Sequence, residues 1–239
     1  MSPPQSRKRW GKLLIGLLVV GFVVVLTGLG IWQVQRLGWK TDLIARVEAR
    51  LAAPVSDAPG PSVWPALDRK TDEYTRVAVT GEYLPGSDAL VMAVTKLGGG
   101  YWVMSPLRTS GGWTLWINRG FVPYDRSTPA DRQLPQGEQQ ITGLLRLSQP
   151  GGGFLRSNDP AADRWYSRDV AALSASRGIG EAAPYFIDAS RKSGDTLPIG
   201  GLTVVTFRNA HLGYAITWFA LAAGLAVASF IFLRREWRR

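Results

Sequence analysis

Two long apolar stretches, one near each end of the chain, dominate the pattern of hydrophobic and polar positions. The first covers residues 13–32 and the second covers residues 212–233. Each has about 20 residues, and at ~1.5 Å rise per residue an α-helix of that length crosses a ~30 Å hydrocarbon core. The pattern therefore predicts two transmembrane helices, which we place at residues 13–34 and 211–233.

Between these stretches the periodicity changes along the chain. Apolar residues recur every three to four positions over residues 37–51, which predicts an amphipathic helix that continues the first span and ends before Pro54. Beyond it, short runs rich in β-branched and aromatic residues alternate with Gly, Pro and Asp, a pattern typical of strands. These runs cover residues 74–83, 89–94, 101–107, 113–118, 140–147, 185–188 and 202–207.

One further helix is predicted among the strands. Ser167 is a suitable N-cap, Asp169 suits the positive end of the helix dipole, and Gly178 can end the helix. Short strands without long intervening helices indicate an antiparallel sheet or a small barrel. The expected fold is therefore a membrane protein in which two transmembrane helices flank a single β-rich α+β domain, residues 35–210.

The short tails outside the two apolar stretches are strongly basic, and cytoplasmic flanks of membrane helices carry excess Lys and Arg. Both tails, residues 1–12 and 234–239, are therefore expected in the cytoplasm, with the domain on the other side. The tails hold eight basic residues and one acidic residue, so they supply +7 of the net charge of +10. Because the excess of basic residues lies in these tails, it predicts contact with lipid headgroups and no binding of nucleic acid. The basic residues are Arg7, Lys8, Arg9, Lys12, Arg234, Arg235, Arg238 and Arg239.

A cleaved signal peptide is the alternative interpretation of the first apolar stretch. That stretch is longer than a typical signal core and passes into Ile31-Trp32-Gln33 without a small-residue cleavage site, which favours a retained anchor. A mitochondrial presequence needs an Arg- and Ser-rich amphipathic leader, and only twelve residues precede the span. A bacterial inner membrane, with the domain in the periplasm, is therefore the expected location.

The composition excludes several kinds of chemistry. The chain has no Cys, one His and three Met, which argues against disulfides, thiolate catalysis and a metal cage of protein ligands. It contains no Gly-x-Ser-x-Gly elbow, and its Gly-rich stretches lack the Lys-Ser/Thr of a phosphate-binding loop. We therefore expect a protein that is not an enzyme.

Several separated blocks resemble those of one family, the surfeit-locus proteins that assist assembly of cytochrome c oxidase. The blocks follow the family's order along the whole chain, and the layout with two anchors agrees. One departure concerns Ala210, where the family usually has an Asn before the His. The blocks are residues 30–36 with Trp39-Lys40, Tyr74-Thr75-Arg76-Val77, Gly81-Glu82-Tyr83, Ser105-Pro106-Leu107, residues 117–123, Asn158-Asp159-Pro160 with Trp165 and Asp169, residues 208–212, Tyr214-Ala215 and Trp218-Phe219.

The resemblance implies an assembly factor that binds haem a and helps deliver or retain it during maturation of oxidase subunit I. It also implies partners: subunit I, other oxidase assembly factors and the enzymes of haem a synthesis. The alternative is a structural scaffold that stabilises an oxidase intermediate and binds no cofactor. The resemblance places the haem site at His211, and a neutral imidazole is a normal axial ligand of haem iron.

The residues around His211 permit such a site. On a helix, Tyr214 and Trp218 lie on roughly the same face as His211, together with Ala215 and Ala222, and form an aromatic and small-residue wall. Interfacial anchoring of His211, as in aromatic belts, is the alternative.

Three residues flank the predicted helices on the same side of the membrane. Arg36 and Arg208 are candidates to pair with the haem propionates. The alternative is that their side chains snorkel to the membrane surface or pair with acidic residues. Trp32 is a candidate for the aromatic wall of the haem site, or it anchors the helix at the membrane interface as part of an aromatic belt. In the domain, Arg119 is expected to contact a partner or to form a structural ion pair, and Asn158-Asp159-Pro160 is expected to form a turn through Asx side chains.

Overall fold

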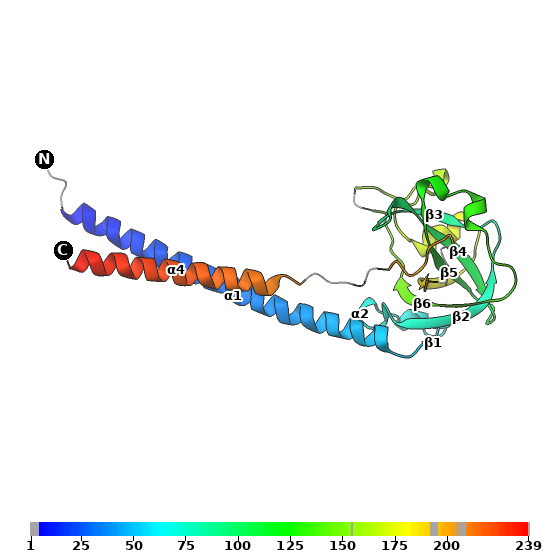
Figure 1. The fold of residues 1–239 in the computed structure, drawn as a ribbon, viewed down its shortest axis with the longest axis horizontal. Helices are drawn as coiled ribbons and strands as arrows, with labels where there is room; N and C mark the ends of the chain where they lie inside the picture. The colour runs from blue at the N-terminus through cyan, green and yellow to red at the C-terminus, as the bar shows by residue number, and fades with distance from the viewer. Residues whose placement is uncertain (1–4, 154, 192–195, 204, 206–208, 239) are drawn as a thin grey trace. The chain divides into compact units, whose positions relative to one another are not determined.

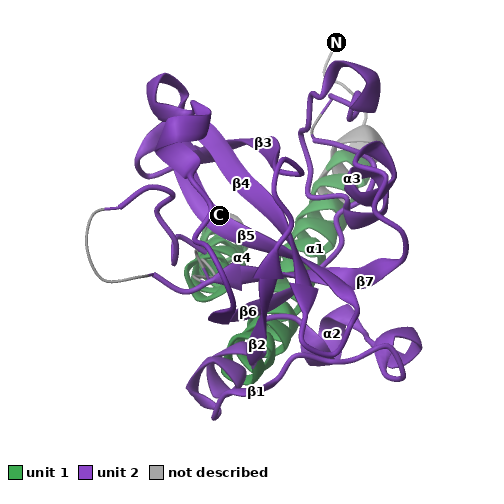
Figure 2. Cartoon of the chain, turned by 90° about the vertical axis from the view of Figure 1, so that its right-hand side faces the viewer, with its two compact units in different colours: residues 1–46, 206–239 green, residues 47–205 purple. Residues whose placement is uncertain are grey.

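The computed structural model describes residues 5–153, 155–191, 196–203, 205 and 209–238. The chain divides into two compact units, residues 1–46 with 206–239 and residues 47–205 (Figure 2). The first unit contains α4 (His211–Trp237) and most of α1 (Gln5–Ala52), and the second contains the β-sheet (Figure 1).

The two long helices confirm the first expectation from the sequence. Residues 14–52 and 211–235 form helices long and apolar enough to cross a membrane. Helix α1 continues from the apolar stretch through the amphipathic segment and ends at Ala52. It stops there because Pro54 disfavours helical backbone in the residue that precedes it.

Seven strands form one sheet in the order β1-β2-β6-β7-β5-β4-β3. Strand β2 also pairs with β4, so that β2, β6, β7, β5 and β4 close into a small barrel, which is one of the two architectures predicted. The strands are β1 (Ser56–Asp57), β2 (Arg76–Tyr83), β3 (Ala89–Thr95), β4 (Gly98–Thr109), β5 (Thr114–Pro123), β6 (Gln139–Leu147) and β7 (Ala182–Ala189).

Closure of the barrel depends on a glycine in β2. This strand pairs with β6 over residues 76–81 and with β4 over residues 81–83, so Gly81 lies where the partners change. A Cβ atom at Gly81 would lie 2.2 Å from the carbonyl oxygen of Arg108 in β4. Only glycine allows two backbones to approach so closely at this corner.

The core lies on both sides of the central strands. Leu115 and Ile117 of β5 face the barrel interior, while Trp116 between them packs against the other cluster. The interior cluster contains Val77, Val79, Tyr83, Leu107, Leu115, Ile117, Ile141, Leu145, Ala183, Tyr185 and Ile187. The outer cluster contains Ala89, Val91, Met104, Trp116, Trp165, Val170, Leu173 and Phe186. Burial on both faces explains why β5 is apolar over consecutive positions.

The outer cluster is covered by α3 (Val170–Ser176), the helix predicted among the strands. Its N-cap is Asp169, which accepts a hydrogen bond from the Ala172 N–H, and the Trp116 indole donates to Ser174 Oγ at 2.9 Å. The prediction of Ser167 as the cap was wrong, because the Ser167 hydroxyl accepts from Gly152 N–H and from the Asn158 amide instead. A second helix, α2 (Arg69–Asp72), is a single turn.

Two further features differ from the expectation. Strand β7 pairs parallel to β5, because it inserts between β5 and β6 and runs antiparallel to β6. The strand expected at residues 202–207 is absent among the described residues of that segment, 202, 203 and 205, and the remainder lies outside the described residues. Thr203 instead donates its hydroxyl to Asp188 at 2.9 Å.

A network of buried charges fixes one side of the barrel. Asp188, 4% exposed, accepts hydrogen bonds from Asn118, Arg146 and Arg168 at 2.7, 3.1 and 3.1 Å. Arg146 also pairs with the buried Glu73 at 3.2 Å. Burial lowers the pKa of Arg168, whereas at Arg146 burial is outweighed by the nearby Asp188 and Glu73 and the pKa is raised. The two arginines and two carboxylates balance each other inside the domain.

Candidate functional site

The two long helices of the first unit pack along a seam that repeats every three and four residues. In α4 the less exposed positions are His211, Ala215, Trp218, Ala222, Leu225 and Ser229. In α1 they include Val19, Val23, Leu26, Gly30, Gln33 and Leu37. This spacing is the one by which paired helices keep a common seam.

A close contact between the helices lies at Gly30. A Cβ atom there would approach the Phe219 ring of α4 to 2.6 Å, so no other residue fits without a shift. Ala215 and Ala222 on the facing helix are 2% and 6% exposed. Small residues at such positions let membrane helices approach closely.

His211 meets Gln33 across this seam. The Nδ1 atom of His211 lies 2.7 Å from Oε1 of Gln33. A carboxamide oxygen can only accept a hydrogen bond, so the His211 Nδ1 atom carries a proton and donates it. In the neutral imidazole this leaves the lone pair on Nε2, the atom that is available to a metal ion.

Asn209, two residues before His211, has a buried side-chain oxygen to which no described residue donates a hydrogen bond. Its Nδ2 atom donates to Thr41 Oγ1 of α1 at 3.5 Å, while Oδ1 has no hydrogen-bond donor among the described residues. An unpaired buried acceptor costs about 1–3 kcal/mol, which a donor from a ligand or from water would recover. In the described part of the chain, Asn209 Oδ1 is therefore an unsatisfied polar atom near His211 at the end of the seam.

The other residues proposed for the site lie in different surroundings. Trp218 is half-buried in the seam, whereas Tyr214 is 58% exposed and lies off the seam, away from the face predicted for it. Trp32 is 52% exposed, and the exposed Arg36 places its guanidinium 4.4 Å from the Trp39 ring. Arg208 lies outside the described residues. The structure thus brings together His211, Trp218, Ala215 and Ala222 on one face of α4.

Gln33 is the residue that the sequence reasoning missed. It stands inside the block of residues 30–36, but the sequence alone does not show that it faces His211. The spacing of Gly30, Gln33 and Leu37 by three and four residues was the available signal. In the described part of the chain, no cluster of three or more His, Cys, Asp or Glu residues offers an alternative metal site.

The domain residues that the sequence analysis singled out have structural partners. The Asn158 side chain accepts from the backbone N–H groups of Tyr166 and Ser167, and Asp159 accepts from Ala162, which confirms the predicted turn chemistry. Arg119 donates to the carbonyl oxygens of Arg132 and Gln133. Within the described ranges its guanidinium contacts no carboxylate, so the expected ion pair is not found among these residues.

Comparisons with known proteins cover almost the whole chain. A family model described as the SURF1 family matches residues 20–223. The chain is 36% identical over 231 residues to Surfeit locus protein 1 of Rattus norvegicus, which covers 89% of this chain and 72% of that protein. The human Surfeit locus protein 1 is 37% identical over 218 residues, 82% of this chain and 70% of that protein. A SURF1-like protein of Monosiga brevicollis is 36% identical over 251 residues, 98% and 92% of the two chains.

Proposed function

Since the chain belongs to the SURF1 family, and hence to the assembly factors of cytochrome c oxidase, we propose that it binds haem a and helps deliver or retain it during maturation of oxidase subunit I. The proposed mode of action is binding alone, without covalent chemistry. The single observation that carries the proposal is the contact of His211 with Gln33, which leaves Nε2 of the imidazole as a potential iron ligand.

The surroundings of His211 fit such a ligand. Metal-binding histidines usually donate their second ring nitrogen to a fixed acceptor, which sets the tautomer and the ring orientation, and Gln33 Oε1 occupies that role. Trp218, half-buried beside His211, supplies an aromatic surface against which a flat macrocycle can pack, and Ala215 and Gly30 hold the two helices close together there. The haem iron would supply an acceptor for the imidazole lone pair. Asn209 Oδ1 remains available to a donor on the ligand.

Charge and hydropathy support a location for this activity. We propose that the protein crosses the bacterial inner membrane twice, with both basic tails in the cytoplasm and the domain in the periplasm. His211 and Gln33 then lie at the periplasmic ends of the two apolar stretches. Subunit I, a membrane protein of the same bilayer, is the proposed client, with other assembly factors and the enzymes of haem a synthesis as further partners.

A structural scaffold that stabilises an oxidase intermediate is the second candidate function. The observation that favours it is the same contact, because a single polar pair in an apolar seam can fix the register of two helices without any cofactor. In that case the His211–Gln33 hydrogen bond serves only helix pairing. The two functions differ in whether the purified protein carries haem a.

Absorption spectroscopy on variants tests the proposal. The full chain is purified from cells that also make haem a, alongside His211→Ala, His211→Met and the control Ile216→Ala, which changes a residue 61% exposed on the same helix. We expect the native chain and the control to share one haem spectrum, and the His211 variants to lose or alter it while the domain stays folded. Unchanged spectra in the His211 variants would rule out axial ligation by this residue.

A further inference from the structure

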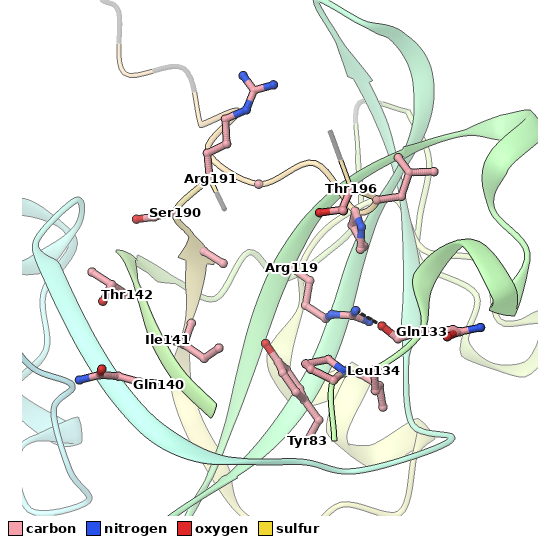
Figure 3. Close-up of a pocket in the computed structure, with 15 residues that line it drawn as sticks. Tyr83, Arg119, Gln133, Leu134, Gln140, Ile141, Thr142, Ser190, Arg191 and Thr196 are labelled. Atoms are coloured by element: carbon pink, nitrogen blue, oxygen red, sulfur yellow. Dashed lines mark hydrogen bonds between the residues drawn. The ribbon is translucent and has the colours of Figure 1, made fainter. Parts of the chain in front are cut away.

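The β-domain contains a cavity of about 520 Å³ that the haem proposal does not use. Its walls come from β2, β5, β6, the end of β7 and the segments on either side of them, and none of its lining residues belongs to α1 or α4 (Figure 3). The volume falls within the range of ~300–1,000 Å³ typical of small-molecule sites. Tyr83 and Arg119 both line it, and neither takes part in the proposed haem site.

Arg119 brings a positive charge to this cavity, and among the described residues no carboxylate contacts its guanidinium. Its guanidinium donates to the carbonyl oxygens of Arg132 and Gln133 and lies 5.5 Å from the centre of the Tyr83 ring. The nearby Asp88 is paired with Arg132 at 2.8 Å. A guanidinium has more N–H groups than two carbonyls can accept, and burial lowers the pKa of Arg119.

Tyr83 places a second donor beside this charge. Its ring is 9% exposed, and Figure 3 shows its hydroxyl directed into the cavity. Burial raises the pKa of Tyr83 to about 12, so the phenol remains a neutral O–H donor at physiological pH. Ile141, Leu134 and Leu197 add apolar surface to the lining.

The walls of the cavity are held in place by backbone contacts. Ile199 exchanges two backbone hydrogen bonds of 2.9 Å with Phe121. Gly120 has φ +136°, and a Cβ atom there would lie 2.3 Å from the Ile199 carbonyl carbon. Ile199 and Gly200 are thereby held against β5, and Gly200 is part of the cavity wall.

We propose that this cavity binds a small organic monocarboxylate, with the carboxylate between Arg119 and the Tyr83 hydroxyl and an apolar body against Ile141 and Leu134. A guanidinium fork matches a carboxylate in geometry, and one cationic group with a neutral phenol balances one negative charge. The second arginine of the lining, Arg191, points away from Tyr83 and Arg119 in Figure 3, which favours a monoanion over phosphate.

Titration of the full chain in detergent with benzoate, benzamide and inorganic phosphate tests this proposal. Benzamide keeps the shape of benzoate without its charge. We expect saturable benzoate binding by calorimetry, with benzamide and phosphate bound at least about tenfold more weakly. Arg119→Gln should weaken benzoate binding about tenfold and Tyr83→Phe about fivefold. The control Arg108→Gln changes an exposed arginine of β4 that does not line the cavity and should leave the affinity unchanged.

Tyr83→Phe removes a single hydroxyl, so it tests the site even if Arg119→Gln, which also loses the contacts to two carbonyls, does not fold. No saturable benzoate binding, or equal affinities for benzoate and benzamide, would overturn the proposal. The proposal is independent of haem a, since the probes are measured on protein purified from cells that do not make haem a.

Discussion

At the scale of single residues, the contact between His211 and Gln33 connects packing to function. The 2.7 Å hydrogen bond fixes the imidazole by its Nδ1 atom and leaves Nε2 for a ligand. The sequence alone identified His211, because it is the single His of the chain and stands at the start of an apolar stretch. It did not identify Gln33, because the partner comes from a helix far away along the chain and depends on how the two helices pack.

Gln33→Leu removes the acceptor and keeps a side chain of similar size. We expect this variant to bind haem a about 10- to 100-fold more weakly than the native chain, as found when an outer-shell partner of a metal ligand is removed. Gln33→Glu keeps an acceptor and should retain most of the affinity. Gln35→Leu, at an exposed position two residues on, is the matched control. Haem titration followed by absorbance measures the difference, and equal affinities of Gln33→Leu and the control would show that Gln33 does not position His211.

Asp188 is the residue on which the buried charges of the domain converge. Asp188→Ala leaves Arg146 and Arg168 without their shared carboxylate, and breaking a buried pair in this way costs about 3–5 kcal/mol. Denaturant unfolding of the full chain in detergent, followed by tryptophan fluorescence, should show a much lower midpoint. Arg126→Ala, which removes an exposed pair with Asp131, should leave the midpoint almost unchanged. Equal midpoints for the two variants would show that the Asp188 network adds little stability.

At the scale of elements, short runs rich in β-branched and aromatic residues between Gly, Pro and Asp were sufficient to find β2 to β7, and Pro54 gave the end of α1. The parallel pairing of β7 with β5 could not be predicted, because strand order depends on which edges the rest of the barrel leaves open. The apolar run that begins at Leu202 suggested a strand. Among the described residues of this run, Thr203 donates its hydroxyl to the buried Asp188, a contact that depends on the folded barrel.

The seam between α1 and α4 predicts that substitution of Gly30 disturbs helix packing and that substitution of the nearby Gly28 does not. Gly30→Leu would drive a side chain into the Phe219 ring, whereas a side chain at Gly28 meets no atom within 4 Å. We therefore expect Gly30→Leu to separate the helices and to reduce haem binding, and Gly28→Leu to do neither. The chain has no native cysteine, so disulfide cross-linking between introduced cysteine pairs along the seam reports the packing. If the two variants cross-link equally, the two helices do not pack along this seam through Gly30.

At the scale of the whole molecule, the charge of the tails predicts the arrangement in the membrane. Reporter enzymes fused at residue 5 and after Arg239 should both report the cytoplasm, and one inserted near Pro59 should report the periplasm. A C-terminal reporter on the periplasmic side would contradict the arrangement with two spans. The family resemblance, the two helices and the continuation of α1 beyond the span as one helix were all accessible from the sequence.

The central claim is that the intact protein holds haem a. The most direct test is the pyridine haemochrome spectrum of pigment extracted from the native full chain, purified from cells that make haem a and lack the oxidase. We predict haem a in an amount approaching one per chain, because one axial histidine is present. Protein that carries no haem a, but still restores oxidase assembly when returned to a deletion strain, would contradict the account and establish the scaffold function instead.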